Sequence, residues 1–335
     1  MSVAALDAQS LPVLSVKDLA IGFDGRRGTV TALSDVSFDI AAGEILGVVG
    51  ESGAGKSLTG TAVIGLLEKP GRMLGGSIAL RGERIDQLGA RDMRRIRGKR
   101  IGAVFQDPLT SLNPLLRVGD QIVETIRTHL PVGEAEARRR ALSLLREVGI
   151  PAPEVRIDHY PHQFSGGMRQ RVVIALALCA GPELIIADEP TTALDVSIQA
   201  QITSLLRRLC REHGAAIMLV THDMGVIAET ADRVAVMYAG RIVEIGPVDD
   251  VVHHPRHPYT QGLMASIPSV RRRSATLQQI DGAMPRPGSW PQGCAFHPRC
   301  PRAVDRCRAE RPPLEGAGPH AAACWRPVEE DRHAG

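Results

Sequence analysis

The sequence predicts an α/β fold with a parallel β-sheet at its centre and a small irregular extension at its C-terminus. The first observation is a set of short apolar runs at 44–50, 183–189 and 215–223, the last two of which end in polar residues, a pattern typical of strands buried on both faces. The second is the glycine-rich stretch GESGAGKS at 50–57, which follows the first of these runs. The third is the change of composition after about Pro255, where proline, arginine and cysteine replace periodic apolar residues.

The composition is that of a globular protein with an ordinary charge balance. The 335 residues are enough for two domains, and 44% of them are apolar. The 40 basic and 37 acidic residues leave a net charge of +3, so we expect no nucleic-acid partner and expect the basic stretches 91–100 and 271–273 to be solvated. The most apolar run, 172–180, is far shorter than the roughly 18 residues of a spanning helix, so membrane contact is expected only through partners.

The secondary structure is expected to begin with strands. The stretches 11–23 and 31–40 favour β-structure, and 44–50 predicts a third strand. The glycine-rich stretch follows this strand at once, and 57–67 is expected to be a helix. Strand, glycine-rich loop and helix in this order is the context that a phosphate-binding loop requires.

The second half of the chain predicts helices and then strands again. From about 107 to 165 the sequence is polar with helical periodicity, which indicates a helical insert. The apolar runs at 183–189 and 215–223 then predict two further strands of the parallel sheet. The stretch 233–246 predicts a hairpin that turns at Ala239-Gly240.

The stretch at 50–57 has the spacing G-x-x-x-x-G-K-[ST], which suits a chain of phosphates. Its glycines let the backbone N–H groups converge on phosphate oxygens, its lysine places a charge on the outer phosphates, and its serine hydroxyl can ligate Mg²⁺. The positive end of the following helix adds to the attraction. The candidate nucleotide-binding residues here are Gly50, Ser52, Gly53, Gly55, Lys56 and Ser57.

Two carboxylates follow the apolar run LIIA. Asp188 and Glu189 come at the carboxyl end of a buried strand, where ligands bind in open α/β sheets. We expect Asp188 to hold Mg²⁺, directly or through water, and Glu189 to orient and deprotonate an attacking water. Alone, such a pair could equally be a solvated acidic turn, but the phosphate loop upstream favours the catalytic interpretation.

A third motif, FSGGMRQR at 164–171, resembles the signature sequence of ATP-binding-cassette (ABC) proteins. With it come Gln106 in AVFQDP, Asp195 at the end of TTALD, and His222 in LVTHDM. These stand in the order in which ABC ATPases carry the Q-loop, signature, catalytic strand, D-loop and switch histidine. The resemblance covers roughly residues 12 to 250 and implies an active ATPase.

The resemblance implies the fold and the place of each motif. It implies a P-loop ABC nucleotide-binding domain over 1–254, with a RecA-like core, an antiparallel β subdomain and a helical subdomain at about 107–165, followed by an extension over 255–335. It also implies that ATP is sandwiched between two subunits. The residues that it adds to the site are Phe23 for the adenine ring, Gln106 for Mg²⁺ and catalysis, Ser165, Gly166 and Gly167 for the partner's ATP, Asp195 in the D-loop, and His222 for the γ-phosphate.

The tail narrows the group within that family. The stretches 257–268 and 293–307 resemble the C-terminal part of ATPases from bacterial oligopeptide and dipeptide importers. This implies a peripheral subunit on the cytoplasmic face of the inner membrane. Its implied partners are a second ATPase subunit, expected to be a paralogue, two transmembrane permease subunits and an extracytoplasmic peptide-binding protein. Because relatives with the same sequence pattern serve nickel uptake, nickel remains the alternative cargo.

A non-transport ABC protein is the alternative from another class. Repair members carry long coiled-coil insertions and translation members carry two cassettes, whereas this chain has one cassette and an insert of ordinary size. The sequence therefore favours a transport ATPase over a DNA-repair or translation factor.

Four of the six cysteines crowd the tail with the spacing C-x₅-C-x₆-C-x₁₆-C. Four thiolates suit a [4Fe–4S] cluster or a tetrahedral Zn²⁺, and the lack of a C-x₂-C knuckle favours the cluster, as does the resemblance to some peptide-importer ATPases. Reduced cysteines without metal remain an alternative, and His297 and His320 are possible substitute ligands. The expected ligands are Cys294, Cys300, Cys307 and Cys324, whereas Cys179 and Cys210 are expected to be buried small residues.

Overall fold

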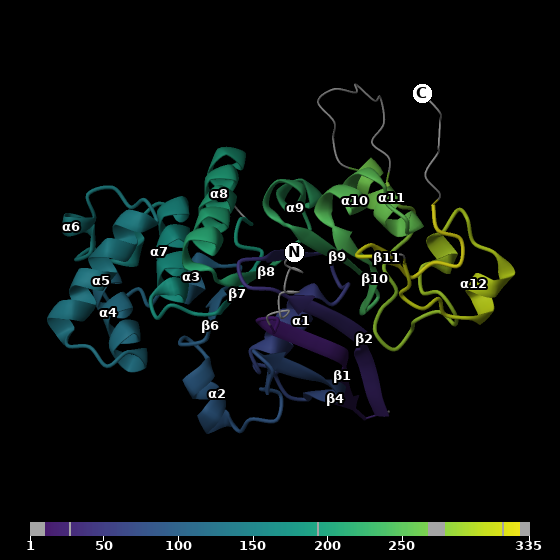
Figure 1. Cartoon of the computed structure of the whole chain (residues 1–335), viewed down its shortest axis with the longest axis horizontal. Helices are drawn as coiled ribbons and strands as arrows, with labels where there is room; N and C mark the ends of the chain where they lie inside the picture. The colour runs from purple at the N-terminus through teal and green to yellow at the C-terminus, as the bar shows by residue number, and fades with distance from the viewer. Residues whose placement is uncertain (1–10, 27, 193, 267–278, 317, 329–335) are drawn as a thin grey trace, which may run out of the picture.

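The computed structural model describes residues 11–26, 28–192, 194–266, 279–316 and 318–328. The basic stretch 271–273, expected to be solvated, lies outside these residues. Two β-sheets form the centre of the molecule, and helices pack around them (Figure 1).

The N-terminal strands form an antiparallel sheet in the order β2-β1-β4-β5. It contains β1 (Leu14–Gly25), β2 (Gly28–Ile40), β4 (Gly71–Leu80) and β5 (Glu83–Arg84). The two strands expected at 11–23 and 31–40 are thus confirmed. Strand β1 begins and ends later than expected, whereas β2 begins earlier and ends at the expected residue.

The larger sheet has seven strands in the order β11-β10-β9-β3-β8-β7-β6. The five strands from β9 to β6 are parallel, and β10 and β11 are antiparallel to their neighbours. The expected hairpin is confirmed as β9 and β10, which turn at Ala239 and Gly240. The strands are β3 (Ile45–Val49), β6 (Ile101–Val104), β7 (Leu184–Asp188), β8 (Ala216–Thr221), β9 (Arg233–Tyr238), β10 (Arg241–Pro247) and β11 (Ala321–Ala322).

The apolar runs of the parallel strands are buried on both sides, as the sequence predicts. In β8, Ile217 and Leu219 belong to one apolar cluster, whereas Met218 and Val220 belong to another. Because successive side chains of a strand point to opposite faces, a run of unbroken apolar residues fills both clusters at once. The sheet therefore separates two cores.

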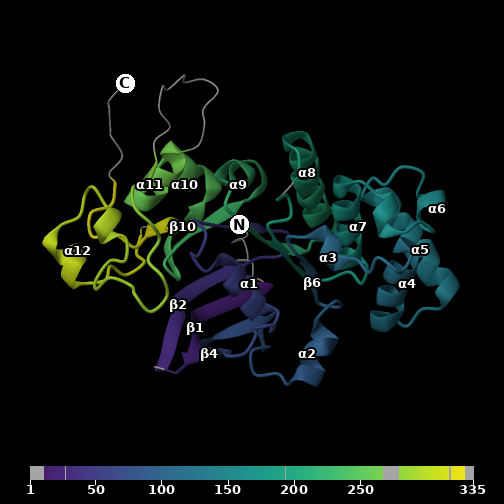
Figure 2. The same cartoon turned by 180° about the vertical axis from the view of Figure 1, so that it is seen from behind.

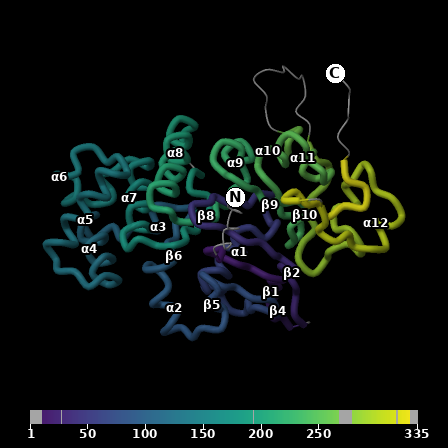
Figure 3. Tube along the Cα trace, viewed as in Figure 1, coloured from purple at the N-terminus to yellow at the C-terminus, as the bar shows by residue number. Residues whose placement is uncertain are grey.

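Helices cover both faces of this sheet. On one face lie α7 (Gly166–Leu178), α8 (Val196–His213) and α9 (Met224–Thr230), which contribute to one cluster. On the other lie α1 (Lys56–Val63) and α2 (Ala90–Ile96), which share the second cluster with the antiparallel sheet. The tube view shows α2, β1, β4 and β5 on one side and α8 and α9 on the other (Figure 3).

Short helices occupy the stretch expected to be a helical insert. They pack on one another and on α7. In the longest of them, α5, the buried residues Ala137, Ala141 and Leu145 recur every four residues, so a single stripe faces the neighbouring helices. The elements are α3 (Pro108–Ser111), α4 (Val118–His129), α5 (Glu134–Glu147), α6 (Pro153–Arg156) and η1 (Pro161–Gln163).

The C-terminal extension packs against the cassette at the other end of the molecule. Strand β11 pairs with β10, with Ala322 opposite Glu244, so the extension adds an edge strand to the large sheet. Phe296 is 2% exposed and belongs to the same cluster as α7 to α9. The other elements here are α10 (Val248–His253), α11 (Pro258–Ala265), η2 (His297–Arg299) and α12 (Asp305–Ala309). In both opposite views α12 and α4–α6 lie at the two ends (Figures 1 and 2).

Within the described residues, no helix is both long and apolar enough to cross a lipid bilayer.

Candidate nucleotide site

The glycine-rich loop lies between β3 and α1, in the predicted strand–loop–helix context. Gly53 and Gly55 have φ angles of +84° and +105°, which residues other than glycine rarely adopt. At Gly50 the φ angle is +155°, and a Cβ atom there would lie 2.3 Å from the carbonyl oxygen of Met237. The glycines are therefore required by backbone shape and by close packing of the loop on β9.

Lys56 is folded back onto this loop. Its Nζ donates hydrogen bonds to the carbonyl oxygens of Gly50 at 2.8 Å and Glu51 at 3.1 Å, and the side chain is buried. Burial lowers its pKa, although the nearby carboxylates, of which Glu189 has the largest effect, oppose this. The ammonium group thus stands inside the curve of the loop, where an outer phosphate would replace the carbonyl oxygens as its partner.

Ser57 and Asp188 come together from α1 and the end of β7. The Ser57 hydroxyl donates to Asp188 Oδ1 at 2.9 Å. Burial raises the pKa of Asp188, the hydrogen bond from Ser57 opposes this, and neighbouring Glu189 adds to it. One carboxylate and one hydroxyl at this spacing suit Mg²⁺, which usually takes one or two carboxylates, phosphate oxygens and waters as ligands.

Glu189 adopts a strained backbone conformation with a φ angle of +47°. Such strain costs on the order of 1–3 kcal/mol and persists only where the surroundings hold the residue in place. Its Oε2 accepts from Thr192 Oγ1 at 2.8 Å and from Gln106 Nε2 at 3.1 Å, and its Oε1 lies 3.2 Å from His222 Nδ1. The Q-loop, catalytic-strand and switch residues of the sequence analysis therefore meet at one carboxylate.

The ionisation of Glu189 suits a base. Burial would raise its pKa, but the hydrogen bonds from Thr192 and His222 and the charge of Lys56 outweigh burial, so the pKa lies below its usual value. The carboxylate is consequently ionised at neutral pH. Thr192 was not singled out from the sequence, although it lies in the TTALD stretch.

These residues line a cavity of about 990 Å³. Phe23 lies in its wall, as expected for a platform under an adenine ring. Leu263 and Pro287 also line it, and both follow the predicted cassette boundary, so the extension reaches the cavity. Nothing in the irregular sequence around Pro287 indicated this. The predicted residues that line the cavity are Phe23, Gly50, Ser52, Gly53, Gly55, Lys56, Ser57, Gln106, Glu189 and His222.

The signature residues do not line this cavity. Ser165 is the N-cap of α7, and its hydroxyl accepts from the backbone N–H of Met168 at 3.3 Å. Gly166 and Gly167 form the first turn, and Asp195 is the exposed N-cap residue of α8. The start of a 13-residue helix leaves backbone N–H groups free to meet an anion. This separation fits the expectation that they face the ATP of another subunit.

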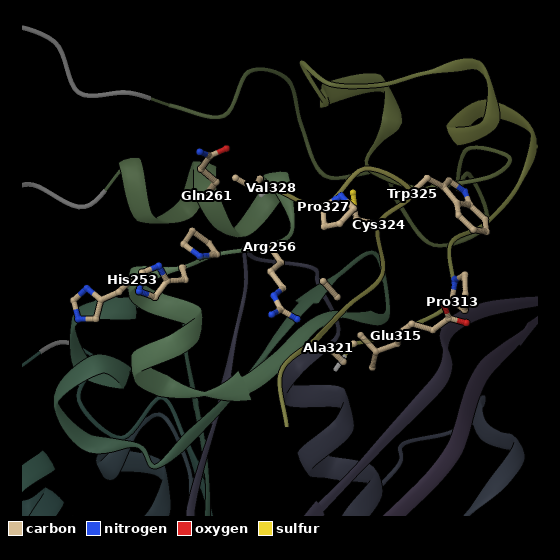
Figure 4. A pocket seen from close by; sticks show the side chains of 15 residues that line it. His253, Arg256, Gln261, Pro313, Glu315, Ala321, Cys324, Trp325, Pro327 and Val328 are labelled. Carbon is tan, nitrogen blue, oxygen red and sulfur yellow. The ribbon is translucent and has the colours of Figure 1, made fainter. Parts of the chain in front are cut away.

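A larger cavity, of about 1490 Å³, lies elsewhere (Figure 4). It is bounded by α10, α11 and the last described residues, and its lining includes His253, Arg256, Gln261, Glu315 and Trp325. None of the predicted nucleotide residues lines it. Size alone would therefore have misplaced the site.

The four tail cysteines line one small cavity together with His297. Burial raises the pKa of Cys294 to about 11 and also raises the pKa values of Cys300 and Cys324. Among the described residues, however, no group of three or more His, Cys, Asp or Glu side chains is arranged to hold a metal ion. The structure thus lends no support to the expected [4Fe–4S] cluster.

The two remaining cysteines and the two histidines proposed as substitute ligands lie as follows. Cys179 and Cys210 are buried, as expected, and burial raises their pKa values to about 12 and about 11. His320 is not a substitute ligand, because its Nε2 lies 2.7 Å from Glu244 Oε1 in a buried pair. His297 Nδ1 lies 3.0 Å from the carbonyl oxygen of Cys294.

Comparison with known proteins gives two family matches. The ABC transporter profile matches residues 33–192, and the profile of the oligopeptide/dipeptide transporter C-terminal region matches residues 243–307. A probable peptide ABC transporter ATP-binding protein of Sinorhizobium fredii is 50% identical over 320 residues, which cover 95% of this chain and 96% of that protein. The oligopeptide transport ATP-binding protein OppD of Salmonella typhimurium is 48% identical and covers 95% of both chains.

Among solved structures, a dimeric ATP-binding cassette in a post-hydrolysis state bound to ADP and Pi is similar to this chain. The TM-score is 0.63 at 29% sequence identity, and the match covers 70% of this chain and 98% of the cassette. The matched fold is therefore that of the cassette.

Proposed function

Because the chain belongs to the ABC transporter family, we propose that it is the ATP-hydrolysing subunit of an importer of di- or oligopeptides. The observation that carries the ATPase part is the meeting of Gln106, Thr192 and His222 at the ionised Glu189, in the same cavity as Lys56 of the phosphate loop. A positioned carboxylate beside a phosphate loop is the equipment for hydrolysis of a phosphoanhydride.

We assign the steps to side chains as follows. Lys56 would exchange the carbonyl oxygens of its own loop for the outer phosphates of ATP, and Ser57, Asp188 and Gln106 are the residues that would hold Mg²⁺. Bound Mg²⁺ neutralises charge on the phosphates. Glu189 orients a water and accepts its proton, and His222, which already contacts Glu189, takes the γ-phosphate as its second partner.

The signature and D-loop residues are proposed to act on a second subunit. Ser165 is exposed at the start of α7, where Gly166 and Gly167 are partly exposed, and Asp195 and Val196 are exposed at the start of α8, with Val196 82% exposed. Closure of two such subunits around ATP would cover these groups. The bound γ-phosphate then favours the closed dimer, and its loss by hydrolysis favours the open one. We expect the second subunit to be a paralogue.

A groove of about 540 Å³ is proposed as the contact with the membrane permeases. It lies between α1, β6 and α7, and Leu66, at 42%, and Phe105, at 46%, are exposed along it. Apolar side chains exposed beside a groove favour a protein partner. Because Phe105 precedes Gln106 directly, a permease seated here would be coupled to the catalytic carboxylate, and the chain would lie peripherally on the cytoplasmic face of the membrane.

The cargo is assigned by relatives and not by the site. The relatives above have names that refer to peptides, and their similarity extends through the tail region. This favours peptides over nickel and disfavours a repair or translation factor. An extracytoplasmic peptide-binding protein would deliver the cargo to the permeases.

The tail is proposed to bind a metal through Cys294, Cys300, Cys307 and Cys324. The proposal rests on the donor set alone: four cysteines line one cavity, although no three His, Cys, Asp or Glu side chains among the described residues are arranged as ligands. A [4Fe–4S] cluster and Zn²⁺ both suit four thiolates. Either would stabilise the folded state of a segment that has few apolar residues to bury.

A Lys56→Ala variant tests the ATP site. We expect its ATP Kd to rise about 10- to 100-fold, the worth of a hydrogen bond to a charged group, and peptide uptake to be lost in a deletion strain that carries the variant. Lys99→Ala, which removes an exposed lysine, serves as the control. Wild-type ATP affinity in Lys56→Ala would refute the proposed ATP site. Unchanged uptake of labelled peptides in the deletion strain itself would refute peptides as the cargo.

A further inference from the structure

Arg299 of the C-terminal extension forms an ion pair with the phosphate loop. Its Nη1 lies 2.8 Å from Glu51 Oε2 and its Nη2 lies 3.0 Å from Glu51 Oε1, so the pair is bidentate. The Arg299 side chain is 7% exposed and that of Glu51 is 28% exposed. A bidentate pair that is largely shielded from water is stronger and more directional than a surface ion pair.

The guanidinium group is fixed from several sides. Its Nε donates to the carbonyl oxygen of Asp281 at 2.8 Å, and its Nη2 also donates to that of Ile280 at 3.1 Å. It lies 5.8 Å from the ring centroid of Tyr238 and 6.0 Å from that of Phe296. Arg299 is therefore a preorganised cation, and Glu51 is the partner that the loop supplies.

A second residue after the cassette holds the same loop position. The Tyr259 hydroxyl accepts a hydrogen bond from the backbone N–H of Glu51 at 2.8 Å. Tyr259 is fully buried, and its ring packs edge-on against Tyr238 with centroids 4.7 Å apart. Burial raises the pKa of Tyr259, so the hydroxyl stays neutral. The backbone and the side chain of Glu51 are thus both held by residues that follow the cassette.

The charge of Glu51 is unfavourable for a nucleotide site. Glu51 lines the same cavity as Lys56, and its carbonyl oxygen accepts from Lys56 Nζ. A carboxylate beside a bound triphosphate repels it, and this repulsion is little screened in a partly buried cavity. Arg299 neutralises the carboxylate and turns it toward the extension.

We propose that Arg299 is a positioning residue that sets the ATP affinity of the phosphate loop by neutralising Glu51. The inference rests on the proposed ATP site and adds a role for the extension, which touches that site through Arg299 and Tyr259. Because coupling between two sites is reciprocal, ATP binding and the docking of this part of the extension stabilise each other.

A double-mutant cycle tests the proposal on the full chain, with ATP–Mg²⁺ as the probe. We expect Arg299→Gln to raise the ATP Kd about 5- to 50-fold, in the range of common coupling energies. In the Glu51→Gln variant, the same Arg299→Gln change should raise the Kd less than twofold, since no carboxylate is left to neutralise. A merely structural role of Arg299 would weaken binding equally in both backgrounds.

Further measurements separate the role from a loss of folding. Arg306→Gln removes the same charge from an exposed position of α12 that pairs with Glu310, and it should leave the ATP Kd unchanged. Arg299→Lys should restore part of the affinity, and kcat at saturating ATP should change less than KM in Arg299→Gln. Equal Kd values for wild type and Arg299→Gln would overturn the inference. The proposed ATP site would not be affected by that result, because Lys56→Ala tests it separately. An equal loss of affinity in both Glu51 backgrounds would also overturn it.

Discussion

Glu189 combines a strained backbone with contacts that hold it in place. Its φ angle of +47° is unfavourable for a residue with a side chain, and three neighbours fix the carboxylate by hydrogen bonds. Although burial acts to raise its pKa, two of these contacts, with Thr192 and His222, and the charge of Lys56 lower it, so conformation and ionisation are set largely by the same neighbours. In the proposed role as a base, Glu189 gains from the fixed conformation, because its carboxylate does not have to reorient toward the water, and from being ionised, because only the carboxylate form can accept a proton.

Glu189→Gln separates binding from hydrolysis at this residue. The amide keeps the size of the side chain but cannot accept a proton, so we expect ATP binding to persist and the hydrolysis rate to fall roughly 10²–10⁴-fold. Single-turnover hydrolysis of radiolabelled ATP measures this. Glu212→Gln, a change of an exposed residue paired with Arg208, is the control. Unchanged turnover in Glu189→Gln would remove it from the role of base.

The start of α11 links helix capping to the nucleotide loop. His257 is the N-cap, its Nδ1 accepts from the backbone N–H of Tyr259 at 3.1 Å, and it is 1% exposed. Its backbone N–H donates to Glu244 Oε2 at 2.9 Å. Burial lowers the pKa of His257 to about 4, with the charge of Glu244 opposing the shift. The neutral ring keeps the lone pair on Nδ1 that accepts the bond from Tyr259.

This predicts acid sensitivity of the fold at one element. The pKa falls from 6.5 to about 4 on folding, so between these values the unfolded chain binds more protons. The free energy of unfolding should therefore decrease as pH falls from 6.5 to 4, by up to about 3 kcal/mol from this group. His257→Asn keeps a cap acceptor but does not titrate. Urea unfolding of both proteins at several pH values measures the difference, and parallel pH profiles would contradict the prediction.

At the scale of the whole molecule, the extension and the cassette share one core. Phe296 and Tyr259 lie in the cluster that also holds α7 to α9, and β11 completes the edge of the large sheet. The buried pair of His320 and Glu244 joins the two parts once more. The composition change after Pro255 thus marks a change of local structure and not a break in packing.

Cys300→Ser tests whether the tail cysteines hold a metal that stabilises the protein. If the cysteines hold a metal, we expect the purified wild type to contain it and the variant to lose it and unfold at a lower temperature. Iron, sulfide and zinc counts with a visible absorption spectrum distinguish a cluster from Zn²⁺. Cys210→Ser, in a buried site outside the tail, should leave the metal count unchanged. A wild type without metal would reject the proposed centre.

Several features of this protein are local in sequence and were predictable from it. The strand–loop–helix at 45–63, the hairpin at 233–247 and the helices of 108–163 each depend on glycine positions or apolar periodicity within a short stretch. The order of the motifs likewise indicated the ATPase. Helix α1 ends at Val63, short of the expected Leu67, because Gly65 turns the chain with a φ angle of +64°, and the backbone N–H groups of Gly65 and Leu66 bond back to the carbonyl oxygens of Ala62 and Thr61.

Only the tertiary structure decided which distant residues meet. Glu51 and Arg299 are 248 positions apart, and Glu244 and His320 are 76 apart. Neither pair belongs to a motif with a spacing, because a contact across the fold depends on how elements pack and not on their separation in the chain. The sequence by itself therefore determined the family and its nucleotide chemistry, and it predicted the residues that line the cavity around Lys56. The packing of the extension alone placed the Arg299 guanidinium against Glu51 of the phosphate loop.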